Sequence, residues 1–292
     1  MVVTYNRQAL LRECLVALRA QTHPLACILV VNNRSTDGTA EMLAQQSAAG
    51  VSPPLQVITE PENRGGAGGF HDGLQAAAGQ EFEWFWLLDD DVIVLPNALE
   101  ELLRARESFA TEPRPILLAS KITLANGTID PATIPRLNDR RDMAQMCRAA
   151  EHGTLALRLN AFVAVLIHRS AVERYGLPIA SYFIWLDDVE YTARILRDNF
   201  GVLVPRSVVL HKKTTDHADP SPRFYYAVRN ELWMIRCSEA WSAEERLRLV
   251  GGLVWMISRR LFKPRFAFAT LGVICRGLFD GLFRSPRVPE RS

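Results

Sequence analysis

Three adjacent carboxylates, Asp89, Asp90 and Asp91, follow an apolar run in the segment FEWFWLLDDDV. Like charges placed side by side destabilise a fold unless something cationic neutralises them. Mg²⁺ and Mn²⁺ prefer hard oxygen ligands and commonly bridge a protein carboxylate to substrate phosphates. A polar loop after a strand explains one aspartate easily and three with difficulty. The triplet therefore favours a divalent-cation site over a polar loop.

A second acidic cluster, in WLDDVEYTAR, places Asp187, Asp188 and Glu190 within one turn at the start of a predicted helix. Acidic side chains stabilise helix N-termini, so capping is one explanation of this cluster. A general base held in a partly apolar pocket, where its pKa can be tuned, is the other. The residues alone leave both explanations open.

Two further features extend the candidate site. His211 ends a predicted strand and offers a metal site a third protein ligand, although a lone histidine is more often structural or exposed. Lys212 and Lys213, which follow it, are predicted to face phosphates. The glycine-rich stretch NRGGAGG at 63–69 would let backbone amides approach a phosphate, but it matches neither GK[ST] nor GxGxxG, and a flexible turn is the alternative.

The elements that must position these residues alternate along the N-terminal part of the chain. Strands are predicted at 2–6, 27–33, 55–60 and 82–88, with helices at 7–21 and 35–46 and a glycine-rich loop leading into a helix at 63–79. This alternation predicts a doubly wound α/β sheet. Polar clusters at 4–6, 32–33, 60–64 and 89–91 all fall at the carboxyl ends of strands, so we expect them to converge on one crevice.

The pattern changes after Asp91. The sequence predicts one or two antiparallel strands at 116–129, a loop or insertion at 130–153, and a strand followed by a helix at 156–176. A helix is expected at 183–201 and a strand at 202–214. From about Phe224 onward the pattern is largely helical.

The composition limits the number of domains, the class of ligand and the cellular compartment. The 292 residues, 48% hydrophobic, suit one domain with a smaller appendage, and a net charge of +2 gives no argument for nucleic-acid binding. Five scattered cysteines without a CxxC pair predict reduced thiols in a cytosolic protein. No signal peptide is expected, the apolar run 266–275 is too short to span a bilayer, and the opening MVVTYN suggests that residues precede Met1.

Basic and apolar residues are interleaved near the C-terminus, in MISRRLFKPRFAFATLGVICRGLFDGLF at 256–283. This mixture suits helices lying in a membrane interface near anionic lipids. It equally suits helices that pack on the catalytic domain or on a second subunit.

The ordered set of motifs, from TYN through NNxSTDGT, ENRGGAGG, LDDD and WLDD to a late histidine, resembles the inverting glycosyltransferases of family 2, over roughly residues 1–235. Such enzymes have a nucleotide-binding fold of the GT-A type. The segments ENRGGAGGF, LDDDV, FIWLDDVEYTAR and YYAVRN are most similar to bacterial galactofuranosyl- and rhamnosyltransferases, which extend lipid-linked cell-envelope glycans. The resemblance implies a UDP-galactofuranose or dTDP-rhamnose donor and Mg²⁺ or Mn²⁺.

The resemblance also implies roles for individual residues. Nucleotide contacts would come from Thr4, Asn33, Arg64, Asp89 and Asp90, and metal ligands from Asp89, Asp91 and His211. Asp188 would be the catalytic base, with Asp187 beside it. The implied organisation is a catalytic domain at 1–223, with a nucleotide-sugar half at about 1–120 and an acceptor half at about 121–223, and a helical region at 224–292. A peripheral location on the inner face of the cell membrane would follow, and a homo-oligomer is left open.

Two departures from the family pattern matter. Asn32 stands where an acidic residue is usual, and Trp185 is separated from the aspartate pair by Leu186. The alternatives are a family 2 transferase with another hexose donor, a non-catalytic nucleotide-sugar-binding protein, and a nucleotidyltransferase. The last would need a triphosphate-binding signature near the N-terminus, and TYNRQALLRECL has none.

Overall fold

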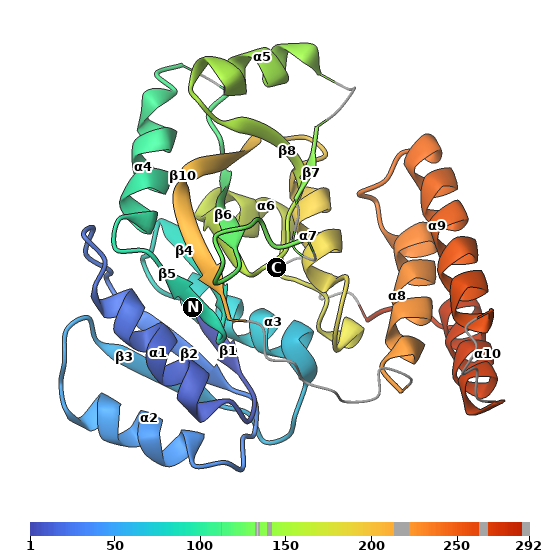
Figure 1. The fold of residues 1–292 in the computed structure, drawn as a ribbon, viewed down its shortest axis with the longest axis horizontal. Coiled ribbons are helices and arrows are strands. Elements are labelled where there is room, and N and C mark those ends of the chain that lie inside the picture. Colours follow the sequence, from blue (N-terminus) through green and yellow to red (C-terminus); the bar gives the residue numbers. More distant parts are fainter. Residues whose placement is uncertain are drawn as a thin grey trace.

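The computed structural model describes residues 1–111, 113–131, 133, 135–138, 142–212, 222–262 and 268–287. Its described residues form one mixed sheet with the strand order β3-β2-β1-β4-β9-β6-β10-β8-β7 (Figure 1). The first half is parallel and contains β1 (Val2–Thr4), β2 (Ile28–Asn32), β3 (Leu55–Thr59) and β4 (Trp84–Asp89). The predicted doubly wound α/β sheet is therefore confirmed.

The second half of the sheet mixes strand directions. β9 (Ala164–His168) runs antiparallel between β4 and β6 (Leu117–Thr123). β10 (Gly201–His211) is parallel to β6 and antiparallel to β5 (Val92–Val94) and β8 (Leu155–Leu159), and β8 pairs with β7 (Arg136–Leu137). The five-residue pairing of β4 with β9 joins the two halves into one layer.

Helices cover both faces of the sheet. α1 (Gln8–Arg19), α2 (Thr39–Ala48) and α4 (Ala98–Ser108) pack on one face, and α3 (Gly65–Ala78), α6 (Arg169–Tyr175) and α7 (Asp187–Ile195) pack on the other. Alternate strand residues divide between the two cores: Val2 contacts the first group and Val3 the second. Because side chains alternate across a strand, a strand covered on both faces reads as a continuous apolar run.

Three helices follow the sheet: α8 (Phe224–Cys237), α9 (Ala243–Leu261) and α10 (Phe268–Phe283). They stand together beside α7, at the right of Figure 1. None of the helices in the described ranges combines the length and the apolar character that crossing a membrane requires. The boundary at residue 223 between a catalytic domain and a helical region stays a prediction.

Several expectations for the middle of the chain were wrong. The stretch 130–153 contains β7 and α5 (Met143–Glu151), whose start is capped by Asp142 through a 3.1 Å bond from the Gln145 amide. The stretch 156–176 holds two strands, β8 and β9, before α6. The stretch 116–129, expected to hold one or two antiparallel strands, holds one strand, β6, which is antiparallel to β9 but parallel to β10, and an isolated bridge joins Thr123 and Ile129.

The glycine-rich stretch forms the first turns of α3 rather than a loop. Glycine disfavours helices, but packing overrides that preference here. A Cβ atom added to Gly69 would lie 2.5 Å from a methyl carbon of Val3 on β1. The glycines therefore let α3 lie close against the sheet.

Candidate active site

The carboxyl ends of the parallel strands meet at one cavity of about 610 Å³. Its size falls in the range of small-molecule sites. Thr4 at the end of β1 donates a 2.7 Å hydrogen bond to Asp90 at the end of β4. Polar residues that line the cavity come from the ends of the parallel strands and the segments that follow them, from the first turn of α7 and from the chain just before α8: Thr4, Asn6, Arg7, Asn33, Asn63, Asp89, Asp90, Asp91, Asp187, Asp188 and Arg223. The predicted convergence on one crevice is confirmed.

Asn33 and Asn32 play different parts at the end of β2. Asn33 donates to the Gly65 carbonyl and accepts from the Arg64 amide, both at 2.8 Å, and so fixes the start of α3. Asn32 accepts a 3.0 Å bond from the Ser35 amide, while its buried Nδ2 has no hydrogen-bond partner in the described part of the chain. Where family 2 usually has a carboxylate, this chain therefore has a buried amide donor.

Arg64 does not point its side chain into the cavity. Its guanidinium pairs with Asp72 and lies 3.9 Å from Glu60, whereas its backbone amide binds Asn33. The nucleotide contact implied for Arg64 stays a prediction.

Arg7 neutralises part of the carboxylate triplet, and sequence reasoning missed it. Its Nη1 atom lies 3.2 Å from Asp90 Oδ1 and 2.7 Å from Asp91 Oδ2. Burial raises the pKa of Asp90 to about 6 even though Arg7 and Thr4 oppose the rise. The only sequence signal was its position next to TYN, directly after a strand end.

Asp89, Asp91 and His211 form a cluster whose candidate ligand atoms all lie within 4.8 Å of one another. His211 Nε2 is 3.3 Å from Asp91 Oδ1, and that oxygen is buried without a hydrogen bond among the described residues. Two carboxylates and one imidazole form a donor set that suits Mn²⁺, and the carboxylates suit Mg²⁺. The residues present therefore fit the divalent cation that the sequence predicts.

Asp130 orients the histidine and was not predicted. The side chain of Asp130 is fully buried, and its Oδ2 lies 2.7 Å from His211 Nδ1. A carboxylate on one imidazole nitrogen fixes the tautomer so that the other nitrogen faces the metal, as is common for histidine ligands. The sequence offered no signal for this contact, because Asp130 lies 81 positions from His211.

The cluster shifts the pKa values of its members in opposite directions. Burial and the charges of Asp91 and Asp90 raise the pKa of Asp89 to about 7. Burial also acts to raise the pKa of Asp91, but the neighbouring His211 and Arg7 outweigh it and lower that pKa. For His211, burial acts to lower the pKa, and Asp91 and Asp130 together raise it.

Asp187 and Asp188 line the same cavity from the first turn of α7. Asp188 Oδ1 accepts a 2.7 Å hydrogen bond from the Val189 amide, so the side chain partly caps its own helix. Burial nevertheless raises the pKa of Asp188 against this and a second backbone bond, from Phe162. A raised pKa makes a carboxylate a stronger base, which the general-base explanation requires.

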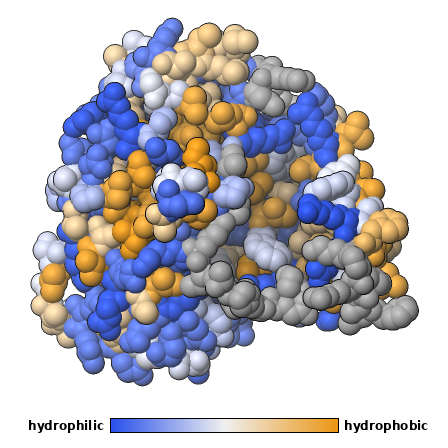
Figure 2. Space-filling view, viewed as in Figure 1, coloured by the Kyte–Doolittle hydropathy of each residue, from blue (hydrophilic) through white to orange (hydrophobic). Residues whose placement is uncertain are grey.

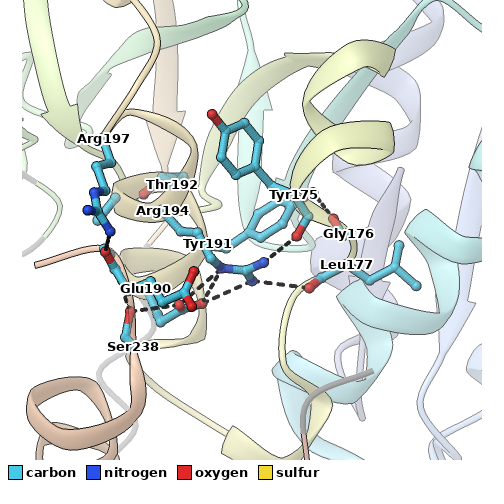
Figure 3. A network of polar contacts seen from close by, with 12 residues as sticks. Tyr175, Gly176, Leu177, Glu190, Tyr191, Thr192, Arg194, Arg197 and Ser238 are labelled. Atoms are coloured by element: carbon cyan, nitrogen blue, oxygen red, sulfur yellow. Dashed lines mark hydrogen bonds and ion pairs between the residues drawn. The ribbon is translucent and has the colours of Figure 1, made fainter. Parts of the chain in front are cut away.

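Glu190, the third member of this acidic cluster, does not line the cavity and belongs instead to a network of polar contacts (Figure 3). It accepts bonds of 3.1 to 3.3 Å from Arg194 and a 2.9 Å bond from Ser238. Arg194 also donates to the carbonyls of Tyr175 and Leu177. This network ties α7 to the chain after α8 and so holds the helix that bears Asp188.

The basic residues of the cavity differ from those expected. Arg7 and Arg223 line it, whereas Lys212 pairs with Glu13 on α1. Lys213 lies outside the described residues. Arg7 and Arg223 are therefore the described basic side chains placed to meet a phosphate.

The sequence matches a family model and known glycosyltransferases. Residues 1–110 match the model of glycosyl transferase family 2. The galactofuranosyltransferase GlfT1 of Mycobacterium tuberculosis is 29% identical over 229 residues, which cover 75% of this chain and 71% of that protein.

The fold matches solved glycosyltransferase structures. S. aureus TarS 1–349 in complex with UDP-GlcNAc superposes with a TM-score of 0.64 at 15% identity, over 96% of this chain and 79% of that one. This chain spans about half (49%) of a longer TarS structure. The mannosyltransferase PcManGT of Pyrobaculum calidifontis, in complex with GDP-Man and Mn²⁺, gives a TM-score of 0.57 at 18% identity, over 97% and 86% of the two chains.

The fold, the carboxylate site at its strand ends and these matches agree with one another. This chain is a glycosyltransferase with the GT-A fold, and its residues 1–110 match glycosyl transferase family 2.

Proposed function

We propose that this enzyme transfers galactofuranose or rhamnose from a UDP- or dTDP-sugar to a hydroxyl of a lipid-linked or polysaccharide acceptor, with inversion at the anomeric carbon. The observation that supports it best is that Asp188, a carboxylate with a raised pKa, faces the same cavity as the triplet Asp89–Asp91. The similarity to GlfT1 favours galactofuranose.

The donor would be held at the parallel half of the sheet. Asp89, Asp91 and His211 would bind Mg²⁺ or Mn²⁺, which when bound supplies positive charge to the diphosphate leaving group. Arg7 and Arg223 add cationic charge on the same cavity. Such groups stabilise charge that develops on the leaving oxygen in the transition state.

Asp188 would act on the acceptor. It removes the proton of the acceptor hydroxyl while that oxygen forms its bond to the anomeric carbon. The bond from the anomeric carbon to the diphosphate oxygen breaks in the same step, and its electron pair leaves with the nucleoside diphosphate. Because the attack comes from the face opposite the leaving group, a single displacement inverts the configuration.

The test compares Asp188→Asn with wild type for binding and turnover of UDP-galactofuranose and dTDP-rhamnose, with Mg²⁺, Mn²⁺ or EDTA. An amide cannot accept the proton, so turnover should fall about 10²- to 10⁴-fold while donor binding persists. Asp198→Asn is the matched control, since the Asp198 side chain is 51% exposed on the surface after α7.

Each result decides a part of the proposal. Turnover of one donor names the sugar, and failure of both donors to bind rejects both sugars. Equal turnover by wild type and Asp188→Asn rejects Asp188 as the base. Binding without turnover by the wild type, with any acceptor, supports the non-catalytic alternative.

We also propose that the enzyme works at the cytoplasmic face of the cell membrane through a C-terminal apolar surface. This surface consists of exposed side chains on α9 and α10, namely Leu247, Val250, Val254, Trp255, Leu271, Phe279, Leu282 and Phe283. Figure 2 shows apolar side chains along the edge where these helices lie. Arg259, 5.1 Å from the ring centre of Trp255, sets a cation beside this apolar surface. Anionic lipid matches this mixture of aromatic and cationic groups.

Sedimentation with vesicles tests the membrane proposal. The wild type should bind phosphatidylglycerol vesicles more tightly than phosphatidylcholine vesicles, and added salt should weaken binding because it screens charge. Val254→Ser with Trp255→Ser should weaken binding several-fold, whereas Val16→Ser, at an equally exposed valine on α1, should not. Unchanged binding in the double variant, or a dimer that dissociates in it, would contradict the proposal and favour the second-subunit explanation.

A further inference from the structure

The backbone just before the aspartate pair is strained. Phe183, Trp185 and Leu186 have φ values of 65°, 67° and 70° although none is glycine. At Phe183, with ψ −59°, the Ile184 amide bonds the Tyr182 carbonyl at 2.8 Å, which makes a tight γ-turn. Such conformations are costly for residues other than glycine and persist only where surrounding contacts hold them.

Asn230 of α8 supplies those contacts from one side. It is fully buried, and its Nδ2 lies within 3.1 Å of three carbonyl oxygens in this segment: Tyr182 at 3.1 Å, Ile184 at 2.9 Å and Trp185 at 2.9 Å. A β-strand or helix would normally satisfy such carbonyls through its own backbone. Here the two hydrogens of one side-chain amide from a distant helix serve these carbonyls, and the Tyr182 carbonyl accepts from the Ile184 amide as well.

Arg229 completes the arrangement. Its Nη2 atom donates to the carbonyls of Ser181 and Tyr182, both at 2.9 Å, and to Asn230 Oδ1 at 2.8 Å. The bond to Oδ1 fixes the orientation of the Asn230 amide, because Arg229 can only donate. The guanidinium also lies 4.1 Å from the ring centre of Trp233, which restricts its own position.

α3 holds the same segment from the opposite side. The Phe183 carbonyl accepts a 3.1 Å bond from the Ala67 amide in the first turn of α3. The Phe183 ring stacks on Tyr226 of α8 at 4.9 Å. Residues 181–186 are therefore fixed between the nucleotide-side helix α3 and the C-terminal helix α8.

We propose that Asn230 and Arg229 are positioning residues that set the place of Asp188 in the cavity by fixing residues 181–186. α7 begins directly after this segment. Any change in the left-handed backbone of these residues would therefore change the direction of the first turn of α7, which carries Asp188. A displacement of about 1 Å in a reacting group can cost about 100-fold in rate. This inference rests on the proposed function, and it assigns the helical C-terminal region a part in catalysis rather than only in attachment.

Two substitutions test the pair, each beside a matched control. Asn230→Ser removes the wide amide, and Arg229→Lys removes the planar guanidinium while keeping the charge. Arg236→Lys is the control, since Arg236 is also an α8 arginine that donates to backbone carbonyls, but to those of Gly281 and Arg284. Lysine in either place leaves the net charge unchanged.

Hydrogen exchange of the purified full-length variants gives a readout that does not require activity. In Asn230→Ser and Arg229→Lys, amides of residues 181–188 should exchange about tenfold faster or more, while those of β1 to β4 keep their wild-type rates. Steady-state kinetics should show kcat lowered about tenfold or more at a donor KM within about twofold, because the donor half is untouched. Arg236→Lys should show neither change.

The outcomes separate this inference from the proposed function. If the wild type transfers neither sugar, the proposed function fails, and exchange alone still decides whether the pair fixes residues 181–186. Wild-type exchange of this segment in both variants overturns the inference. So does faster exchange with unchanged kcat, or an Arg236→Lys variant that behaves like Arg229→Lys.

Discussion

Asp187 is buried beside Asp188, and its protonation is coupled to folding. Burial, reinforced by the charge of Asp188, raises the pKa of Asp187 well above its ordinary value. In the unfolded chain the group has its ordinary pKa of about 3.9. Between these two values the folded state binds more protons than the unfolded state, so the free energy of unfolding decreases as pH rises from about 4 toward the raised pKa.

Asp187→Asn should remove this dependence. An amide of the same shape carries no charge, so the variant should melt at a higher temperature than the wild type at pH 8, and the difference should shrink toward zero near pH 4. Thermal denaturation of the metal-free protein across this pH range measures it. A difference in melting temperature that does not grow with pH would show that Asp187 stays ionised at little cost, and the exposed Asp198→Asn gives the baseline.

The residues that the sequence predicted and those that it missed differ in a physical way. Asp89–Asp91 and Asp188 were found because each follows a readable local pattern, an apolar strand or an acidic helix start, that fixes its position. Arg7 and Asp130 matter through partners more than 80 positions away. Such contacts depend on which strands become neighbours in the sheet. A single sequence does not specify that pairing.

At the scale of elements, Gly65 decides how closely α3 approaches the segment before α7. Its φ is +70°, and an added Cβ atom would lie 1.9 Å from the Phe183 carbonyl oxygen. Gly66, the next residue, has open space around its Cβ position and no left-handed backbone. Substituting each glycine in turn therefore distinguishes the steric requirement at Gly65 from the general effect of glycine on helix stability.

Gly65→Ala should destabilise the protein by about 2 kcal/mol or more, because a left-handed alanine and a backbone clash add together. Gly66→Ala should be neutral or stabilise by up to about 1 kcal/mol, since alanine favours the helix. Urea denaturation of both variants gives the two values. Equal effects at the two positions would mean that the contact with Phe183 does not constrain the fold.

The elements were predictable to unequal degrees. β1 to β4 were found because strands covered on both faces read as continuous apolar runs bounded by polar residues. β8 and β9 were merged into one strand because the apolar stretch 156–168 is hardly interrupted, and only Asn160 marks the break between them. The predicted helix began later than α3 does, because helix propensity argues against a helix that starts with several glycines. The close packing of these glycines on β1 is visible only in the fold.

At the scale of the molecule, a buried ion pair joins the sheet to the C-terminal helices. Arg158 on β8 lies 2.9 Å from Glu245 on α9, and the two side chains are 8% and 3% exposed. Arg158 also donates to the Ala193 carbonyl of α7. Removing one partner of a buried pair leaves the other charge uncompensated, which is far more costly than losing a surface pair.

A double-mutant cycle should show this coupling. Arg158→Met and Glu245→Gln should each destabilise by roughly 3–5 kcal/mol, and the double variant by clearly less than their sum. The exposed pair Arg248–Glu244 on the same helix is the control, where each change should cost about 1 kcal/mol or less. Small, additive effects at Arg158 and Glu245 would indicate that the helices are held to the sheet by other contacts.

The continuity of the sheet from β3 to β7 limits how this enzyme can move. Asp89 ends β4, and Asp188 lies on α7, where Thr192 forms hydrogen bonds with Asn160, the residue after β8. A hinge between the two halves would have to break the ladder that joins β4 to β9 and β9 to β6. We therefore expect Asp89–Asp91 and Asp188 to keep a nearly constant separation while the enzyme works. Bringing two substrates together would then depend on how each one binds, and not on a closure of one half of the sheet over the other.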